Sequence, residues 1–167
     1  MKTAAVGNRI LVLGCSGSGK STLARALAAK TELPLVHLDN VWWRADGTHI
    51  SREDFDRALE TLLRGEKWIM DGDYSRTYEV RVRAADTVIF LDYPKDVCMA
   101  GITARVGQKR SDMPWTESAL DQELVALVQS YRRDNRPQLL SLLQKYPEKQ
   151  SLIFTARQEA ERWLSRL

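Results

Sequence analysis

The sequence has little of what several protein classes depend on. Its 167 residues include only two cysteines, Cys15 and Cys98, which do not form a CxxC pair, so neither a disulfide framework nor a zinc site is indicated. No apolar run approaches the roughly 18 residues that a membrane-spanning helix needs, and no long apolar segment of a secretory signal opens the chain. These absences favour a soluble, cytoplasmic protein whose thiols stay reduced.

The chain also lacks a strong charge of either sign. Lysine and arginine number 25 against 22 acidic residues, which gives a net charge of +3. A balance this mild suits a protein that handles phosphates, but it falls far short of the basic footprint of a dedicated DNA-binding protein. The hydrophobic share of 44% is ordinary for a globular protein, and the length fits one domain.

Apolar runs alternate with helix-forming segments along the chain. Short apolar runs predict strands, and apolar residues spaced three and four apart predict helices between them. The predicted strands cover residues 9–14, 34–39, 67–71, 87–92 and 151–155. Predicted helices cover residues 20–30 and 51–65, begin after Pro94 and near Thr116, and close the chain from residue 156. This order predicts one three-layer α/β domain, with a parallel sheet and helices on both faces.

The strongest motif directly follows the first predicted strand. Residues 14–21, GCSGSGKS, match G-x-x-x-x-G-K-[ST] at every fixed position, between a strand and a helix. Small residues let backbone amides surround a phosphate, and the helix N-terminus adds positive potential. Lys20 would reach the β- and γ-phosphates of ATP, and the Ser21 hydroxyl would bind Mg²⁺. The predicted nucleotide site consists of Gly14, Cys15, Ser16, Gly17, Ser18, Gly19, Lys20, Ser21 and Thr22.

Three aspartates stand where predicted strands end. Asp39, Asp71 and Asp92 each close an apolar run, and ligands of such sheets bind at the carboxyl ends of the strands. One of them should hold Mg²⁺, partly through water; we favour Asp71, with Asp92 as the competitor. Each aspartate could instead cap a turn. Asp39 lies where an acceptor would enter and could orient or deprotonate its hydroxyl, or hydrogen-bond a base or sugar.

Two tryptophans, Trp42 and Trp43, follow Asp39 closely. They could form an aromatic wall for a planar acceptor. Ordinary packing of a mobile subdomain is the alternative, and it is slightly favoured.

Together these motifs resemble the adenylate-kinase-like P-loop kinases, and most closely the small bacterial proteins known as DNA-topology modulation proteins. The matching stretches are residues 14–21, HLDNVWW at 37–43, DGDYSRT at 71–77 and VIFLD at 88–92. The resemblance implies a five-stranded sheet of order 2-3-1-4-5 and phosphoryl transfer from Mg-ATP. It also implies an acceptor-site insertion at about 40–64 and a short lid at about 101–116.

The resemblance further implies roles for single residues. Asp71-Gly72 looks like the D-G of the adenylate kinase motif D-G-F-P-R, whose aspartate contacts the Mg²⁺ shell. Arg76 would match the arginine of that motif, which binds the acceptor phosphate, although one residue is inserted. Asp73 and Tyr74 replace Phe-Pro, so the acceptor is left open. The predicted acceptor-binding residues are Asp39, Trp43, Asp73 and Arg76.

Arginines after the fourth strand are the other implied elements. Adenylate kinases carry two arginines four apart in this helix, and the matching positions here are Gly101 and Arg105, so the first arginine is missing. Arg105 and Arg110 remain candidates for stabilising charge on the transferred phosphoryl group, a role worth roughly 10³-fold or more in rate. Arg157 lies where a purine would bind. Arginines that could replace the lost contact, or simply face solvent, are Arg132, Arg133 and Arg136.

The sequence is compatible with three functions. The first is an ATP-dependent kinase of a nucleotide or other small acceptor, similar to nucleoside monophosphate kinases. The second is a nucleotide-dependent regulatory ATPase associated with DNA, although the sequence has no recognisable DNA-binding motif. The third is an ATPase with no acceptor. The sequence indicates neither the oligomeric state nor a preference for ATP over GTP.

Overall fold

Five parallel strands form the centre of the computed structural model, which describes residues 5–167. The strand order β2-β3-β1-β4-β5 confirms the predicted topology, and every neighbouring pair is parallel. The strands are β1 (Arg9–Gly14), β2 (Leu35–His37), β3 (Trp68–Asp71), β4 (Thr87–Leu91) and β5 (Gln150–Phe154).

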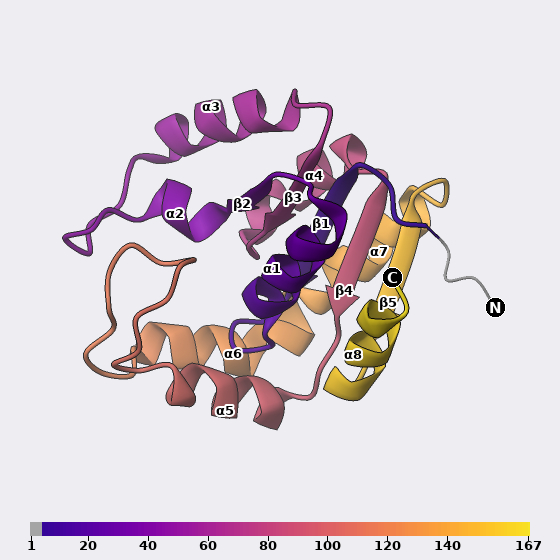
Figure 1. Cartoon of the computed structure of the whole chain (residues 1–167). Coiled ribbons are helices and arrows are strands. Elements are labelled where there is room, and N and C mark those ends of the chain that lie inside the picture. The colour runs from indigo at the N-terminus through magenta and orange to yellow at the C-terminus, as the bar shows by residue number, and fades with distance from the viewer. Residues whose placement is uncertain (1–4) are drawn as a thin grey trace.

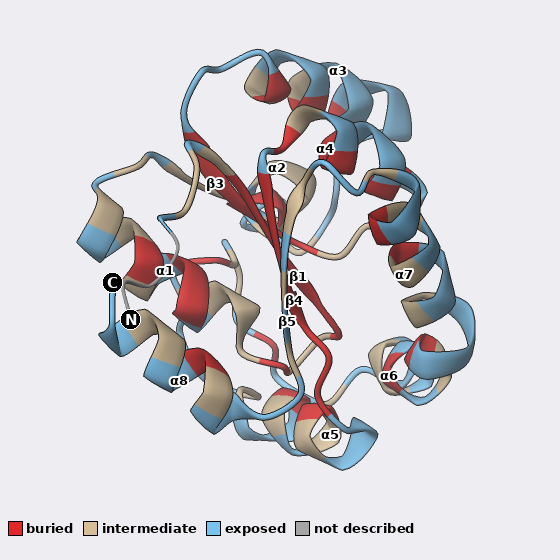
Figure 2. Cartoon of the chain, turned by 90° about the vertical axis from the view of Figure 1, so that its right-hand side faces the viewer, coloured by how far each residue is buried: buried red, intermediate tan, exposed pale blue. Residues whose placement is uncertain are grey.

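Helices cover both faces of this sheet. With the sheet seen edge-on, α1 and α8 lie on one side, and α4 and α7 lie on the other (Figure 2). In Figure 1, α5 and α6 lie at the end of the sheet toward which β4 points. No helix of residues 5–167 combines the length and apolarity needed to cross a membrane. The helices are α1 (Lys20–Thr31), α2 (Leu38–Trp42), α3 (Arg52–Leu63), the 3-10 turn η1 (Ser75–Thr77), α4 (Tyr78–Ala84), α5 (Lys95–Ala104), α6 (Gln122–Asp134), α7 (Arg136–Lys145) and α8 (Arg157–Ser165).

The two central strands explain why their sequences are continuously apolar. Residues 10–13 of β1 and residues 88–90 of β4 have no exposed surface, because helices cover both sides of a parallel sheet. The fifth strand differs from this pattern. It forms an edge of the sheet, and its alternate residues Ser151 and Ile153 are exposed, with Ile153 at 44%.

Some element boundaries differ from the predictions. The strand predicted at 34–39 ends at His37, and Leu38 and Asp39 begin α2, a short helix that was not predicted. The helix predicted near Thr116 begins at Gln122, because the Asp121 side chain accepts a hydrogen bond from the Glu123 amide and caps it there. The predicted lid at 101–116 contains the end of α5 followed by a segment without regular structure. The predicted insertion at 40–64 contains the end of α2, a turn closed by a Trp43–His49 bridge, and α3.

Candidate functional site

The glycine-rich loop lies between β1 and α1, at the carboxyl end of the central strand. Gly17 and Gly19 have φ angles of 84° and 91°, in the left-handed region that glycine adopts without a steric penalty. Gly19 immediately precedes α1, and no side chain caps this helix end. Its first backbone amides are therefore available to an anion, as the motif predicts.

Helix α5 packs directly on this loop, which explains the arginine missing at position 101. A Cβ built on Gly101 would lie 2.0 Å from the Gly17 carbonyl oxygen. Likewise, a Cβ on Gly17 would lie 2.1 Å from the Cys98 carbonyl oxygen. Two glycines thus allow two backbones to approach, and no arginine side chain fits at this place.

A cationic cavity of about 210 Å³ opens beside the loop, and we call it the P-loop cavity. Its walls come from the loop, α1, the end of α5, the segment after α5, and the start of α8. Four arginines and one lysine line it together with only two carboxylates, a balance that suits a polyphosphate. The charged lining residues are Lys20, Arg25, Asp39, Arg105, Arg110, Asp112 and Arg157.

The two predicted transfer arginines both lie in this cavity. Burial lowers the pKa of Arg105, and the nearby charge of Arg110 lowers it further. The Arg105 Nε has no hydrogen-bond partner among the described residues, while Arg110 pairs with Glu117 at 3.2 Å. A guanidinium nitrogen that is buried without a partner favours an anionic ligand, because such a ligand would satisfy it. The Arg157 guanidinium lies next to Gly19, and its predicted role in nucleotide binding stays a prediction.

Asp112 is a site residue that sequence reasoning missed. It is 3% exposed, and its Oδ2 accepts a hydrogen bond of 3.1 Å from the Ser21 hydroxyl. It stands 91 residues from Ser21 in a segment without regular structure, so no local pattern pointed to it. A hydroxyl and a carboxylate oxygen are ligands that suit Mg²⁺.

No cluster of three or more potential metal ligands occurs within residues 5–167. In the Mg²⁺ sites of phosphoryl-transfer proteins, phosphates and water supply most ligands and the protein supplies one or two. The donor set at Ser21 and Asp112 therefore fits Mg²⁺ bound together with a nucleotide.

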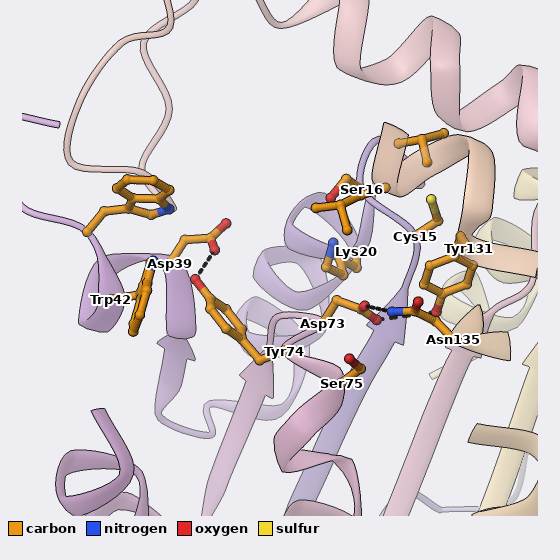
Figure 3. Close-up of a pocket in the computed structure, with 13 residues that line it drawn as sticks. Cys15, Ser16, Lys20, Asp39, Trp42, Asp73, Tyr74, Ser75, Tyr131 and Asn135 are labelled. Carbon is orange, nitrogen blue, oxygen red and sulfur yellow. Dashed lines mark hydrogen bonds between the residues drawn. The ribbon is translucent and has the colours of Figure 1, made fainter. Parts of the chain in front are cut away.

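A second cavity of about 320 Å³ adjoins the first, and we call it the tryptophan cavity. Figure 3 shows Trp42 on one side of it and Tyr131 and Asn135 on the other, with Lys20, Asp39 and Asp73 between them. The residues come from the P-loop, α2, the segment after β3, and α6 with the residue that follows it. They are Cys15, Ser16, Lys20, Asp39, Trp42, Trp43, Asp73, Tyr74, Ser75, Leu127, Val128, Tyr131 and Asn135.

Asp39 stands where the two cavities meet. It lines both of them, as do Ser16 and Lys20. Its Oδ1 accepts a hydrogen bond of 2.6 Å from the Tyr74 hydroxyl. Burial raises the pKa of the Asp39 carboxyl, although the Tyr74 hydrogen bond and the charge of Lys20 act in the opposite direction. A carboxylate with a raised pKa at the boundary between a cationic and an acidic cavity is a candidate proton acceptor.

The segment after β3 has a strained backbone that hydrogen bonds from a buried arginine of α4 hold in place. Tyr74 has a positive φ of 39°, which is rare for a bulky side chain and is often found at functional sites. Arg81 of α4 has no exposed surface. It donates hydrogen bonds to the carbonyl oxygens of Gly72, Asp73 and Tyr74. Sequence reasoning missed Arg81, because α4 was not predicted.

Asp73 lines the tryptophan cavity, and its predicted role in acceptor binding stays a prediction. Its carboxylate accepts hydrogen bonds from the hydroxyls of Tyr78 and Tyr131 and from the side-chain amide of Asn135. Burial raises the pKa of Asp73, while Lys20 and Tyr78 lower it. These donors come from two further helices, so the sequence alone did not associate them with Asp73.

The other two strand-end aspartates do not line either cavity. Asp71 is buried, and its Oδ2 lies 2.6 Å from Nδ1 of His37; its predicted role in holding Mg²⁺ stays a prediction. Both oxygens of Asp92 accept hydrogen bonds from Arg136, and Arg132 lies 3.4 Å away. The predicted role of Asp92 as the competing Mg²⁺ carboxylate also stays a prediction.

The structure does not bring Arg76 to the predicted acceptor site. Its guanidinium group forms two hydrogen bonds with Asp56 of α3 at the protein surface, and it lines neither the P-loop cavity nor the tryptophan cavity. The residue inserted into the D-G-x-x-R pattern places it one position too far along η1. The arginines predicted as replacements are also paired, Arg132 and Arg136 with Asp92 and Arg133 with Asp134.

Comparison with known proteins gives one partial relative. No family model matches the chain. The uncharacterized protein YqaC of Bacillus subtilis (strain 168) is 34% identical over 104 residues. These residues amount to 60% of this chain and 57% of YqaC, so the match spans less than two thirds of that relative.

Solved structures of similar fold are small-molecule kinases. A shikimate kinase from Bacteroides thetaiotaomicron has a TM-score of 0.59 at 21% identity, over 95% of both chains. A gluconokinase from Sinorhizobium meliloti 1021 has a TM-score of 0.55 at 19% identity, over 95% of this chain and 92% of that one. A sugar kinase from a Janibacter species has a TM-score of 0.54 at 23% identity, over 96% and 92%. The chain therefore has the fold of the P-loop small-molecule kinases.

Proposed function

We propose that this protein is a phosphotransferase that moves the γ-phosphoryl group of Mg-ATP to a hydroxyl group of a small molecule. The observation that carries the proposal is the position of Asp39 and Lys20, which line both the cationic P-loop cavity and the tryptophan cavity. A phosphoryl group bound in the first cavity would face a hydroxyl group bound in the second across these two side chains.

The proposed reaction uses the chain's own residues as follows. The amides of the glycine-rich loop and Lys20 bind the β- and γ-phosphates, and Arg105 and Arg110 offset the charge of the phosphoryl group in transfer. The acceptor oxygen attacks phosphorus, and the bond between phosphorus and the bridging oxygen of ADP breaks. Asp39 accepts the hydroxyl proton, so the products are ADP, a phosphate monoester and a protonated Asp39 that later releases its proton.

Magnesium fits this site with Ser21 and Asp112 as protein ligands. When bound, Mg²⁺ would offset phosphate charge. Asp71, the carboxylate that the sequence favours for Mg²⁺, is the alternative to Asp112. The chemical class of the acceptor is a separate question. A nucleoside monophosphate would agree with the resemblance to adenylate kinases, but Arg76, which that resemblance assigns to the acceptor phosphate, pairs with Asp56 instead.

Lys20→Ala tests the donor side of the proposal. We expect Mg-ATP to raise the melting temperature of the native protein and to leave that of the variant unchanged, because the variant lacks the ammonium group that binds the phosphates. Acceptor-dependent ADP release in a coupled assay should fall by at least roughly 10²-fold.

Lys30→Ala, at an exposed position in the last turn of α1, is the matched control and should behave like the native protein. An unchanged thermal shift in Lys20→Ala would contradict the proposed site. ATP turnover at the same rate with and without every acceptor would instead indicate a simple ATPase.

A further inference from the structure

The two adjoining cavities differ in charge. Carboxylates Asp39 and Asp73 line the tryptophan cavity, and Lys20 is the single cationic side chain among its described lining residues. Lys20 also lines the P-loop cavity, where the phosphate motif assigns it to the nucleotide. The tryptophan cavity thus keeps no cation for a carboxylate or phosphate on the acceptor.

Arg105, whose Nε has no partner among the described residues, lines the adjoining P-loop cavity, where we assign it to the transferred phosphoryl group. Four other arginines near the tryptophan cavity are engaged elsewhere. Arg76 is held by Asp56, and Arg132 and Arg136 are held by Asp92. Arg81 contacts the backbone of two residues that line the cavity, Asp73 and Tyr74. It is fully buried, however, and its guanidinium group already donates to three backbone carbonyls and to the Thr77 hydroxyl. None of these four arginines is free to bind an anionic acceptor in the described structure.

The remaining polar groups of the cavity suit hydroxyl or amine groups. The hydroxyls of Tyr74 and Tyr131 donate to Asp39 and Asp73, so each can still accept a hydrogen bond. The Ser75 hydroxyl and the Asn135 side-chain amide, which uses one N–H for Asp73, can both donate and accept. The carboxylates of Asp39 and Asp73 accept hydrogen bonds from an alcohol or an ammonium group. Either carboxylate would repel a second anion in a partly enclosed cavity.

Apolar side chains complete the walls. Trp42 and Trp43 lie on the α2 side, and Leu127 and Val128 of α6 also line the cavity. Leu127 is 59% exposed, a large value for a leucine beside a cavity. An apolar or flat face of a ligand would cover it, since ligand cavities combine apolar walls with a few placed polar groups.

We propose that the acceptor is an alcohol that carries no carboxylate or phosphate, is either uncharged or amine-bearing, and presents an apolar face to the tryptophans and Leu127. This inference rests on the proposed phosphotransferase function. It separates the chain from kinases whose acceptors are anionic, because those acceptors need a cation at this place.

The test compares acceptors in pairs that differ mainly in charge: adenosine with AMP, glucose with gluconate, and the methyl ester of shikimate with shikimate. ADP release is measured for each compound, and binding is measured by thermal shift of the full chain saturated with Mg-ADP. We expect at least one uncharged member to bind and to be phosphorylated with kcat/KM about 100-fold above that of its anionic partner, since like charges at such distances strongly disfavour binding.

Leu127→Arg with Leu127→Gln as its uncharged control sharpens the test. The position is exposed on α6, where both residues fit a helix. Leu127→Arg should shift the preference toward the anionic member of the active pair by about tenfold relative to Leu127→Gln, because it supplies the missing cation.

The outcomes separate the two hypotheses. If Mg-ATP fails to stabilise the protein, the phosphotransferase proposal fails from the donor side. If Mg-ATP binds normally but an anionic member is the better acceptor, the inference about acceptor class is overturned while the kinase proposal stands. It is also overturned if nucleotide binds normally and no uncharged or amine-bearing alcohol binds at millimolar concentration.

Discussion

Asp39 is the carboxylate that we propose as the proton acceptor of this site. It lines both cavities, and its hydrogen bond from Tyr74 fixes one oxygen while leaving the other toward the interior of the site (Figure 3). Burial raises its pKa, which brings a carboxyl group closer to the pH at which it exchanges protons efficiently.

Asp39→Asn should therefore remove catalysis without harming the fold. We expect kcat to fall by roughly 10²- to 10⁴-fold, the usual range for a lost general base, with Mg-ATP affinity within a small factor of native. The amide oxygen can still accept the Tyr74 hydroxyl, so the local structure is kept. The measurement is steady-state ADP release together with calorimetric nucleotide binding.

Asp96→Asn, at an exposed position on α5 outside both cavities, is the control and should retain native activity. Acceptor phosphorylation at the native rate by Asp39→Asn would show that the proton leaves by another route.

The raised pKa of Asp39 also predicts a pH dependence with a definite sign. The base works only when ionised, so the acid limb of kcat/KM should lie above 3.8, the ordinary pKa of an aspartate. For folding, a raised carboxyl pKa means that the native state binds more protons than the unfolded state. This contribution to stability is therefore lost as the pH rises from 3.8 through the folded pKa.

At neutral pH, Asp39→Asn should accordingly be as stable as the native protein or more stable, which thermal unfolding at several pH values will measure. A large drop in melting temperature would contradict this expectation.

At the scale of elements, the sequence predicted those helices and strands whose residue patterns follow from local backbone geometry. The glycine-rich loop, the five strands and helices α1, α3, α5 and α8 follow from contiguous patterns, since a buried parallel strand must be apolar throughout and a phosphate loop needs small residues at fixed spacing. Helix α4 was missed because it has only seven residues, YEVRVRA, two of them β-branched. Helix α7 was not predicted, although Pro137 suits the first turn of a helix.

The packing of α5 on the glycine-rich loop gives an element-level prediction. Gly101→Ala should lower both stability and nucleotide affinity, because its methyl group would lie 2.0 Å from the Gly17 carbonyl oxygen and force one backbone to move. Overpacking of this kind costs about 1–3 kcal/mol, or a drop of roughly 2–9 °C in melting temperature for a chain of this size.

Differential scanning calorimetry with and without Mg-ADP measures both effects. Ala100→Ser, at the exposed neighbouring position on α5, is the control and should change neither quantity appreciably. Native affinity in Gly101→Ala would show that the approach of α5 does not shape the loop.

At the scale of the whole molecule, the segment between α5 and α6 joins the two sides of the site. Asp112 accepts a hydrogen bond from Ser21 beside the P-loop cavity. On the other side, the Asn40 side chain donates to the Ser111 carbonyl oxygen at 2.9 Å, and Trp115 contacts Trp43 edge to face with ring centroids 5.6 Å apart. In Figure 1 this segment extends toward α2.

These long-range contacts belong to the part of the site that could not be predicted from the sequence. Asp39 and the glycine-rich loop were predicted because each closely follows a recognisable strand. Asp112, Tyr131 and Asn135 reach the site from segments 58 to 91 residues away from the groups they contact. Their roles depend on tertiary packing, and the same packing engages Arg76 with Asp56 rather than with an acceptor.

Trp115→Ala tests whether this segment closes both cavities together. Removing the aromatic contact should loosen the segment from α2 and admit water, since closure of such a segment excludes solvent from the transferred group. An edge-to-face aromatic pair contributes about 0.5–1.5 kcal/mol beyond its buried area, so kcat/KM for the acceptor should fall by about 2- to 12-fold. ATP hydrolysis without acceptor phosphorylation should rise in the same variant.

Trp115→Phe, which keeps an aromatic ring facing Trp43, should restore most of the coupling between ATP consumption and product formation. Native coupling in Trp115→Ala would mean that the two cavities close independently of each other.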